Sequence, residues 1–470
     1  MVEQESMERH NPISREGASL PYLVLVVSVA TVGGFLFGYD TLIFTGAGIF
    51  LRDSFQLSPD ELGQAGASVV IGCLFGTWIA ALVSDWIGRK KTMIFAALLF
   101  AVSAVMTAIP PDIHVFNMFR AVGGVGVGIA MVISPVYIAE ISPKRIRGGL
   151  VTLNQIVIVT GALIAAIVGW QMGQHLAPDV SWRWMFASEC IPILGFAAGL
   201  LLIPESPRFL MQKQLEDQAR DVLTRINGAQ VAVEELNEIR ASIELEKTQS
   251  AVSYRELLHP GVRMAMIIAI GLAALQQLSG GMPLNVYAPI ILQDAGFADP
   301  NDAIFVPVLM FSCSLVCVFI VLYLVERVGR RPILLWGVSA MAVGHLVLAY
   351  CFHKPVEGAP IAIALILTAG MSNLSISPLA WVIMAEIFPT RIRGRAMGIA
   401  TFVLYLSMYL TSRYFPPIQE YSESTYGSPA VMFVALAAIC VFGVIFMYVM
   451  VPETKGKSLE EIANHWLEKR

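Results

Sequence analysis

The stretch Ala139-Glu-Ile-Ser-Pro-Lys-Arg-Ile-Arg-Gly148 decides the fold, because it returns as Ala385-Glu-Ile-Phe-Pro-Thr-Arg-Ile-Arg-Gly394 with eight of ten residues identical. Two shorter motifs recur at nearly the same offset. They are Asp85-Trp-Ile-Gly-Arg-Lys90 with Glu326-Arg-Val-Gly-Arg-Arg331, and Pro204-Glu-Ser206 with Pro452-Glu-Thr454. Three motifs repeated in the same order predict that the chain consists of two homologous halves.

The composition excludes a water-soluble fold. Hydrophobic residues make up 56% of the 470 residues and charged residues only 14%, whereas about 25% of the residues are charged in soluble domains. The mean hydropathy is +0.68. These values predict a polytopic membrane protein with the lipid bilayer as its surroundings. The net charge of −4 lacks the basic character of a nucleic-acid-binding protein, so we expect no nucleic-acid partner.

Twelve segments are apolar over about the 20 residues that a helix needs to cross a bilayer. They are 21–46, 62–84, 92–110, 115–138, 150–170, 184–203, 264–292, 304–325, 333–352, 361–385, 396–412 and 429–451. All are expected to be helices, because an open strand edge cannot be satisfied in lipid. The predicted fold class is therefore all-α, with 12 transmembrane helices in two pseudo-symmetric six-helix bundles. Parallel repeats of this kind build transporters whose site lies between the halves.

The distribution of charge along the chain predicts five regions. These are a cytoplasmic N-terminal tail (1–20), an N-terminal bundle (21–203), a cytoplasmic helical linker (204–263), a C-terminal bundle (264–451) and a cytoplasmic C-terminal tail (452–470). Within the linker, amphipathic helices are expected at 213–227 and 233–247, and a third is expected to begin at Ser253.

Lysine and arginine predict the orientation in the membrane. Of the 31 basic residues, 26 fall in the terminal segments, the linker and alternate loops. Four of the others fall in the opposite loops and one in a predicted span. The five are Arg52, Arg183, Lys354, Arg413 and, in the span, Arg120. This asymmetry places both termini and the linker in the cytoplasm, and we expect a multi-pass protein of the cell (inner) membrane.

The repeated motifs resemble those of the major facilitator superfamily. Pro204-Glu-Ser-Pro-Arg-Phe-Leu210 and Pro452-Glu-Thr-Lys-Gly456 are similar to the sugar porter family within it. Met185-Phe-Ala-Ser-Glu-Cys-Ile-Pro192 resembles the bacterial proton-coupled monosaccharide symporters of the xylose type. The resemblance implies alternating access between the halves, with the proton as coupling ion. The sequence contains no nucleotide site, metal cluster or nucleophile constellation, so we expect no enzymatic activity, no metal site and no cofactor.

Carboxylates at span ends lie beside arginine-rich turns in both halves. Such groups form charge-assisted networks that tie helices together, and their breaking and remaking would bias two conformations of a transporter. We expect cytoplasmic gating from Asp85, Arg89, Glu140, Arg147, Glu326, Arg330, Glu386 and Arg393. The alternative is that these arginines only set the topology.

Three ionisable residues, Asp40, Arg120 and Glu189, lie within predicted spans. A charge in hydrocarbon costs at least about 2.5–3.5 kcal/mol on insertion scales, so such a residue is a functional candidate. Arg120 keeps its charge and needs an acidic partner. Asp40 would stay ionised beside Arg120, and departure of Arg120 would favour the neutral acid. The resemblance implies that Asp40 couples transport to the proton, with Arg120 as partner and Glu189 nearby. A static buried ion pair remains the alternative.

A sugar site needs amides for hydroxyl groups and aromatic faces in a mostly apolar pocket. Gln276 and Gln277 are adjacent amides in a predicted span, although polar residues there can also serve as interhelical glue. The resemblance implies substrate contacts at Phe37, Gln276, Gln277, Tyr287, Trp381 and Tyr405, although an aromatic residue in a membrane helix usually only packs.

Several positions depart from the xylose-type pattern, and the exact ligand is therefore not carried over. They are Ala162, Met282, Ser314, Ser377 and Leu404. The sequence predicts proton-coupled import of a small polyhydroxylated solute such as a monosaccharide or polyol, by a protein that functions as a monomer. The alternatives are a passive facilitator of the same fold, a transporter of a non-sugar organic solute and a non-transporting membrane sensor.

Overall fold

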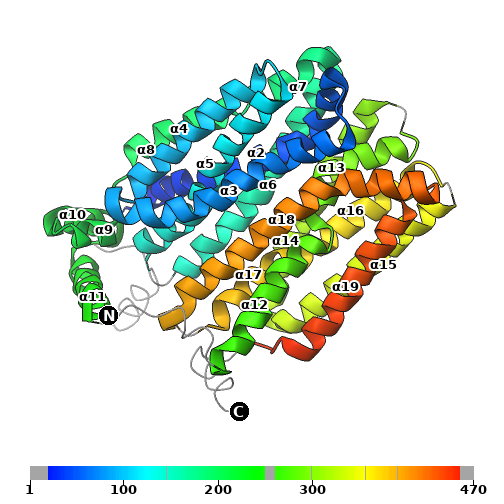
Figure 1. Ribbon diagram of the computed structural model, residues 1–470. Coiled ribbons are helices and arrows are strands. Elements are labelled where there is room, and N and C mark those ends of the chain that lie inside the picture. Colours follow the sequence, from blue (N-terminus) through cyan, green and yellow to red (C-terminus); the bar gives the residue numbers. More distant parts are fainter. Residues whose placement is uncertain are drawn as a thin grey trace, which may run out of the picture.

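A computed structural model describes residues 19–143, 146–248, 260–297, 299–354, 356–388 and 390–455. Within these ranges every regular element is a helix, so the all-α prediction is confirmed. Figure 1 shows two groups of long helices lying side by side, with the linker helices α9, α10 and α11 at one end.

The helix order follows the predicted halves. The first group holds α2 (Leu20–Phe55), α3 (Pro59–Ile87), α4 (Arg89–Ala108), α5 (Ile113–Ile141), α6 (Arg147–His175), α7 (Pro178–Ala187) and α8 (Cys190–Leu202). The linker holds α9 (Pro207–Gln212), α10 (Glu216–Asn227) and α11 (Ala229–Thr248). The second group holds α12 (Pro260–Leu278), α13 (Gly281–Asp294), α14 (Pro300–Val328), α15 (Arg330–His353), α16 (Ala359–Leu374), α17 (Ile376–Glu386), α18 (Thr390–Tyr426) and α19 (Ala430–Met450). The expected linker helix at Ser253 lies outside the described residues.

Eleven of the described helices or joined helix pairs are long and apolar enough to cross a membrane. The predicted span 396–412 lies inside α18, a longer helix that is not among the eleven. Its apolar stretch is interrupted by hydroxyl groups, of which Ser407 and Ser412 are buried. Because α18 packs along α3 of the first group and α12 of its own group, these hydroxyl groups are surrounded by other helices of the protein.

Local sequence signals explain where several helices begin. Ser58 accepts a hydrogen bond from the backbone of Glu61, whose carboxylate accepts one from Ser58, so that a capping box begins α3. Gly88 and Gly329 have φ of +99° and +100°, a region that glycine adopts without strain. The repeated Gly-Arg motif therefore begins α4 and α15 with the same turn.

Three predicted spans are broken helices, which the apolar pattern did not reveal. The breaks lie at Ser188-Glu189 between α7 and α8, at Ser279-Gly280 between α12 and α13, and at Ser375 between α16 and α17. Each break is followed within four residues by a proline, at Pro192, Pro283 or Pro378. Proline has no backbone N–H, so the carbonyl four residues before it loses its helical partner. A proline alone does not predict a break, because α5, α13, α14 and α18 also contain prolines and continue through them.

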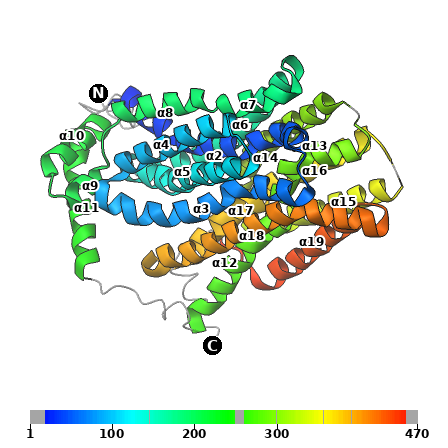
Figure 2. The same cartoon turned by 45° about the horizontal axis from the view of Figure 1, so that its top comes forward.

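The two groups meet along a seam. α3 packs on α18, α6 on α14, and the end of α2 on α13. Figures 1 and 2 show α3 beside α18 along this seam. We call the end of the molecule that carries α9–α11 the linker end, and the opposite end, where α2 and α13 finish, the far end. The broken helices thus place polar backbone in the interior between the two ends.

Candidate functional site

The first half contains a fully buried ion pair. Nη1 of Arg120 lies 2.6 Å from Oδ1 of Asp40, and Nη2 lies 2.9 Å from the Asp40 carbonyl oxygen. Only 1% and 2% of the two side chains are exposed. The guanidinium also lies over the ring of Phe186, 5.3 Å from its centroid. The structure therefore brings together the two residues that the sequence paired, with α2 supplying the acid and α5 the base.

Glu189 lies at the break between α7 and α8, beside this pair. Its side chain is buried and close enough to Asp40 and Arg120 to interact electrostatically with both. At the same break, Ser188 donates its hydroxyl proton to the Met185 carbonyl, 2.5 Å away. It therefore accepts from the hydroxyl of Tyr39, 2.7 Å away, in the turn before Asp40. The broken helix thus holds a second carboxyl group next to a single arginine.

The second half contains the adjacent amides at another break. Gln276 and Gln277 lie in the last turn of α12 and are both buried. Nε2 of Gln276 donates to the Ser377 carbonyl at 2.9 Å, in the first turn of α17. The hydroxyl groups of Ser372 and Ser377 lie 3.1 Å apart across the α16–α17 break. Two helix breaks therefore face each other and carry amide and hydroxyl groups, as in transporter sites built from discontinuous helices.

Three of the four predicted aromatic contacts lie in the interior, and no hydrogen bond fixes them among the residues that the structure describes. Phe37 and Trp381 are half-buried against the main core. Tyr405 on α18 is buried near Cys73 on α3, which lies near Asp40 and Arg120. Tyr405 therefore links the second half to the neighbourhood of the ion pair.

Tyr287, the fourth predicted aromatic contact, is held by a hydrogen bond and by two neighbouring rings. Its hydroxyl donates to the Ser412 carbonyl at 2.8 Å. Its ring stacks on Phe415, with centroids 5.6 Å apart, and meets Phe44 edge-on. Because Phe44 belongs to the other half, Tyr287 here closes the seam towards the far end.

The positions that depart from the family pattern are distributed over both halves. Ser314 accepts from Asn373 at 3.2 Å, and Ser377 joins the α16–α17 break as described. Ala162 is buried, and its backbone nitrogen lies against Gly38, where an added Cβ would collide with the backbone of α6. Met282 is half-buried, and Leu404 is buried.

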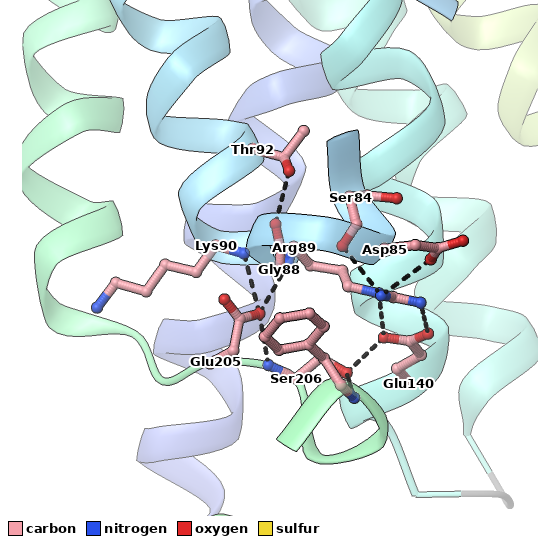
Figure 3. A network of polar contacts seen from close by, with 10 residues as sticks. Ser84, Asp85, Gly88, Arg89, Lys90, Thr92, Glu140, Glu205 and Ser206 are labelled. Atoms are coloured by element: carbon pink, nitrogen blue, oxygen red, sulfur yellow. Dashed lines mark hydrogen bonds and ion pairs between the residues drawn. The ribbon is translucent and has the colours of Figure 1, made fainter. Parts of the chain in front are cut away.

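At the linker end, the first half contains a network centred on Arg89 (Figure 3). Arg89 binds both carboxylate oxygens of Glu140 at 3.1 Å and lies 3.3 Å from Asp85. Ser206 donates to the same Glu140 carboxylate. Glu205 accepts from the backbone N–H groups of Arg89, Lys90 and Ser206 at 2.9 to 3.0 Å. The network joins α3, α4 and α5 to the start of the linker.

The second half repeats this arrangement. Arg330 pairs with Glu326 at 3.1 Å and with Glu386 at 3.2 Å. Glu453 accepts from the backbone N–H groups of Arg330 and Arg331, both at 3.1 Å. The three repeated sequence motifs therefore meet in space in each half, and each network lies within its own half.

Two of the predicted gating arginines need separate treatment. Arg393 does not pair with a carboxylate among the described residues. Its guanidinium donates instead to the Phe388 carbonyl at 3.3 and 3.4 Å. The gating role of Arg393 therefore stays a prediction. Arg147 begins α6, and its side chain lies outside the described residues.

The halves are joined by polar contacts at the far end. Arg413 donates to the Asp60 carboxylate at 2.7 Å and to its carbonyl at 3.2 Å. Arg52 donates to Gln293 at 3.1 Å. The hydroxyl of Thr45 donates to the Asn285 carbonyl at 3.1 Å. At the level of α12 and α17, nearer the linker end, each of these helices packs on helices of its own half. The seam is therefore held shut at the far end.

Sequence reasoning missed four participants. Glu205 and Glu453 were quoted as motif residues without a role, although their repetition at matched places was a signal. Ser188 lies at a helix break that Pro192 follows, whereas His345 reaches the break at Ser279 from another helix, and the sequence carried no signal for it. His345 is fully buried and lies 2.9 Å from the Ser279 carbonyl.

Comparisons of this chain with a family model, with characterised proteins and with solved structures all indicate the same family. The family model described as "Sugar (and other) transporter" matches residues 26–466. The chain is 33% identical to the arabinose-proton symporter of Bacillus subtilis (strain 168), over 98% of each chain. It is 32% identical to the D-xylose-proton symporter of Escherichia coli (strain K12), over 95% of this chain and 96% of that one.

A solved structure of the xylose transporter XylE from E. coli, in an inward open conformation, superposes with a TM-score of 0.82. It is 31% identical, and the match covers 95% of this chain and 100% of that one. The family match spans both halves, and the relatives align over nearly the whole chain. The protein therefore belongs to the sugar porter family of the major facilitator superfamily, a family of membrane transporters.

Proposed function

We propose that this protein imports a small polyhydroxylated solute together with a proton, by alternating access. The observation that carries the proposal is the buried cluster of Asp40, Arg120 and Glu189, in which a second carboxyl group lies beside the Asp40–Arg120 ion pair. A charged group inside a membrane protein marks an ion or proton pathway by default. Relatives named as arabinose-proton and D-xylose-proton symporters support the same assignment.

The solute is proposed to bind between the halves, at the helix breaks of the second half. Gln276, Gln277 and Ser377 offer amide, carbonyl and hydroxyl groups there. Phe37, Trp381 and Tyr405 supply apolar faces for the C–H surface of a sugar ring. Asn373 with Ser314 and Ser372 with Ser377 form hydroxyl and amide pairs where the xylose-type pattern has other residues. This altered polar set favours a pentose, hexose or polyol whose hydroxyl groups differ in placement from those of xylose.

The conformation supports alternating access with the solute path open towards the linker end. Contacts between Arg413 and Asp60 and the Tyr287 cluster close the far end. The linker-end networks around Arg89 and Arg330 stabilise each half as a rigid body. Similarity to an inward open structure supports this direction.

We further propose that the linker end faces the cytoplasm of a cell whose inner membrane holds the protein. The excess of basic residues at this end supports this orientation.

In this orientation a proton enters from the far side and reaches Asp40. Protonated Asp40 no longer balances Arg120, whose guanidinium then turns to Glu189, and the two halves are free to rock around the bound solute. A monomer contains all the residues that this cycle uses.

A transport assay in proteoliposomes tests the proposal. Vesicles with purified protein receive D-xylose, L-arabinose, D-glucose or myo-inositol, and an external electrode records proton movement. We expect at least one solute to enter with alkalinisation of the medium, abolished by a protonophore. Entry of a solute without proton movement would identify a passive facilitator, and entry of none would exclude transport of these solutes.

A further inference from the structure

The break between α12 and α13 leaves one buried carbonyl group without a helical partner. Ser279 is only 1% exposed. The residue four positions later is Pro283, which has no N–H to donate. A buried carbonyl without a donor costs free energy comparable to a lost hydrogen bond, so another part of the molecule has to supply the donor.

His345 on α15 supplies it. Its Nε2 lies 2.9 Å from the Ser279 carbonyl oxygen. A carbonyl only accepts, so Nε2 carries the proton and the ring is held in one tautomer. The ring stacks on Phe433, with centroids 6.5 Å apart. The thiol of Cys440 makes a second, longer contact of 3.8 Å to the same carbonyl. α15 and α19 therefore hold the break from the side away from the seam.

The same ring also packs against the next residue of the break. Gly280 has φ of +89°, and a Cβ placed there would lie 3.1 Å from Cε1 of His345. The last turn before this point carries Gln276 and Gln277. Nε2 of Gln276 is engaged by Ser377, while its Oε1 is buried without a partner among the described residues. The orientation of the Gln276 side chain therefore depends on where α12 ends and on the contacts that fix this end.

We propose that His345 is a positioning residue for the substrate amides Gln276 and Gln277. It acts through the Ser279 carbonyl by fixing the end of α12 and the angle at which α13 leaves it. This inference rests on the proposed function, because it gives the amides of α12 the role of binding solute. His345 itself contacts neither solute nor proton in this account.

Two variants separate the hydrogen bond from the packing. His345→Phe keeps a flat ring against Phe433 and Gly280 but removes the donor. His345→Gln keeps an N–H donor at about the reach of Nε2. Met341→Leu, a buried position one turn earlier in α15, is the matched control for a change of packing in the same helix.

Three readouts are measured on the intact purified transporter. They are the KM and maximal rate of uptake for the best solute of the panel, the rise in melting temperature that this solute causes, and amide hydrogen exchange of segment 276–284. For His345→Phe we expect KM to rise about tenfold, equivalent to about 1.4 kcal/mol of binding, with the maximal rate changed less. The solute-induced stabilisation should shrink, and exchange in the segment should increase.

His345→Gln and Met341→Leu should remain near the parent protein in all three readouts. An unchanged KM in His345→Phe with only a lower melting temperature would overturn the proposal, since it would show a purely structural role. Equal losses in folded His345→Gln and His345→Phe would also overturn it. If no solute is transported by the parent protein, the proposed function fails. Hydrogen exchange in segment 276–284 still decides separately whether His345 holds the break.

Discussion

At the scale of single residues, charge balance around Arg120 explains why the buried cluster is suited to bind a proton. One guanidinium faces two carboxyl groups, Asp40 through a direct bond of 2.6 Å and Glu189 beside it. If both acids were ionised, the buried site would carry an excess negative charge, and an uncompensated buried charge costs free energy. The proposed coupling mechanism uses this charge balance, since one positive charge cannot offset two negative ones.

A double-mutant cycle tests the pairing of Asp40 with Arg120. Breaking a buried pair by removing one partner costs about 3–5 kcal/mol, because the other charge is left uncompensated. Asp40→Asn and Arg120→Gln should each lower the free energy of unfolding in detergent, and the double variant should lose clearly less than the sum. Asp40→Asn combined with the distant Arg413→Gln should be additive. Additive losses in the first pair would contradict a direct interaction.

The sequence predicted this cluster because charged residues stand out in apolar segments. The sequence alone is enough to single out Asp40, Arg120 and Glu189, because this step uses no distances. Tyr39 and Ser188, which bond to each other beside the cluster, are neutral and resemble ordinary interhelical contacts. Their partnership joins residues 149 positions apart, and only the fold brings them together.

At the scale of helices, the repeated motifs act as caps. Glu205 and Glu453 each accept backbone N–H groups from the first turn of α4 or α15. A carboxylate at this position satisfies donors that have no helical partner and interacts favourably with the helix dipole. Glycine at Gly88 and Gly329 lets the chain approach the carboxylate, since a Cβ would collide with it. This explains why the three motifs repeat together.

Removal of one cap should lower stability. Glu205→Ala leaves three N–H groups in a half-buried turn without their acceptor, and we expect a loss of about 1–3 kcal/mol. Thermal unfolding in detergent measures it as a lower melting temperature. Glu453→Ala should behave alike, because its geometry is the same. Glu234→Ala, at an exposed site on α11, should change little. A Glu205→Ala protein as stable as the parent would contradict the capping role.

Helix breaks were the main structural feature that the sequence pattern did not predict. Spans 184–203, 264–292 and 361–385 are apolar over most of their length, and hydropathy alone cannot distinguish a continuous helix from two joined pieces. Prolines within a membrane helix are tolerated when neighbouring groups satisfy the freed carbonyl. Whether such a neighbour exists depends on packing with another helix, as His345 illustrates at Ser279.

At the scale of the whole molecule, the repeat and the charge asymmetry predicted two bundles and their order along the chain. The relative position of the bundles was outside the reach of the sequence. It depends on contacts such as Arg413 with Asp60 and Tyr287 with Phe44. Tyr287 contacts both halves in this conformation, and its contact with substrate stays a prediction. A transporter uses one sequence for two arrangements, so the sequence alone cannot favour one of them.

The far-end contacts should bias the equilibrium between these arrangements. Arg413→Ala removes the bond to Asp60 across the seam and should increase the population that is open at the far end. Spin labels at Asp53 and Glu420, placed in a cysteine-free background and measured by pulsed EPR, report this as a larger fraction of long distances. Because Asp60 is mostly exposed, the shift is expected to be modest.

Arg183→Ala is the matched control for this shift. Arg183 lies near the far end but donates to the Ala108 carbonyl within its own half. Its removal should leave the distance distribution unchanged. An equal shift in both variants, or none in Arg413→Ala, would contradict the assignment of the far-end seam as a closure.

The most direct test of the account measures proton movement with solute in proteoliposomes that contain either the parent protein or Asp40→Asn. The account predicts that the parent takes up protons together with solute and accumulates it under an imposed pH gradient. Asp40→Asn should bind the same solute but neither move protons nor accumulate it. Asp179→Asn, at an exposed site on α7, should resemble the parent. Proton uptake and accumulation that persist in Asp40→Asn would contradict the central claim.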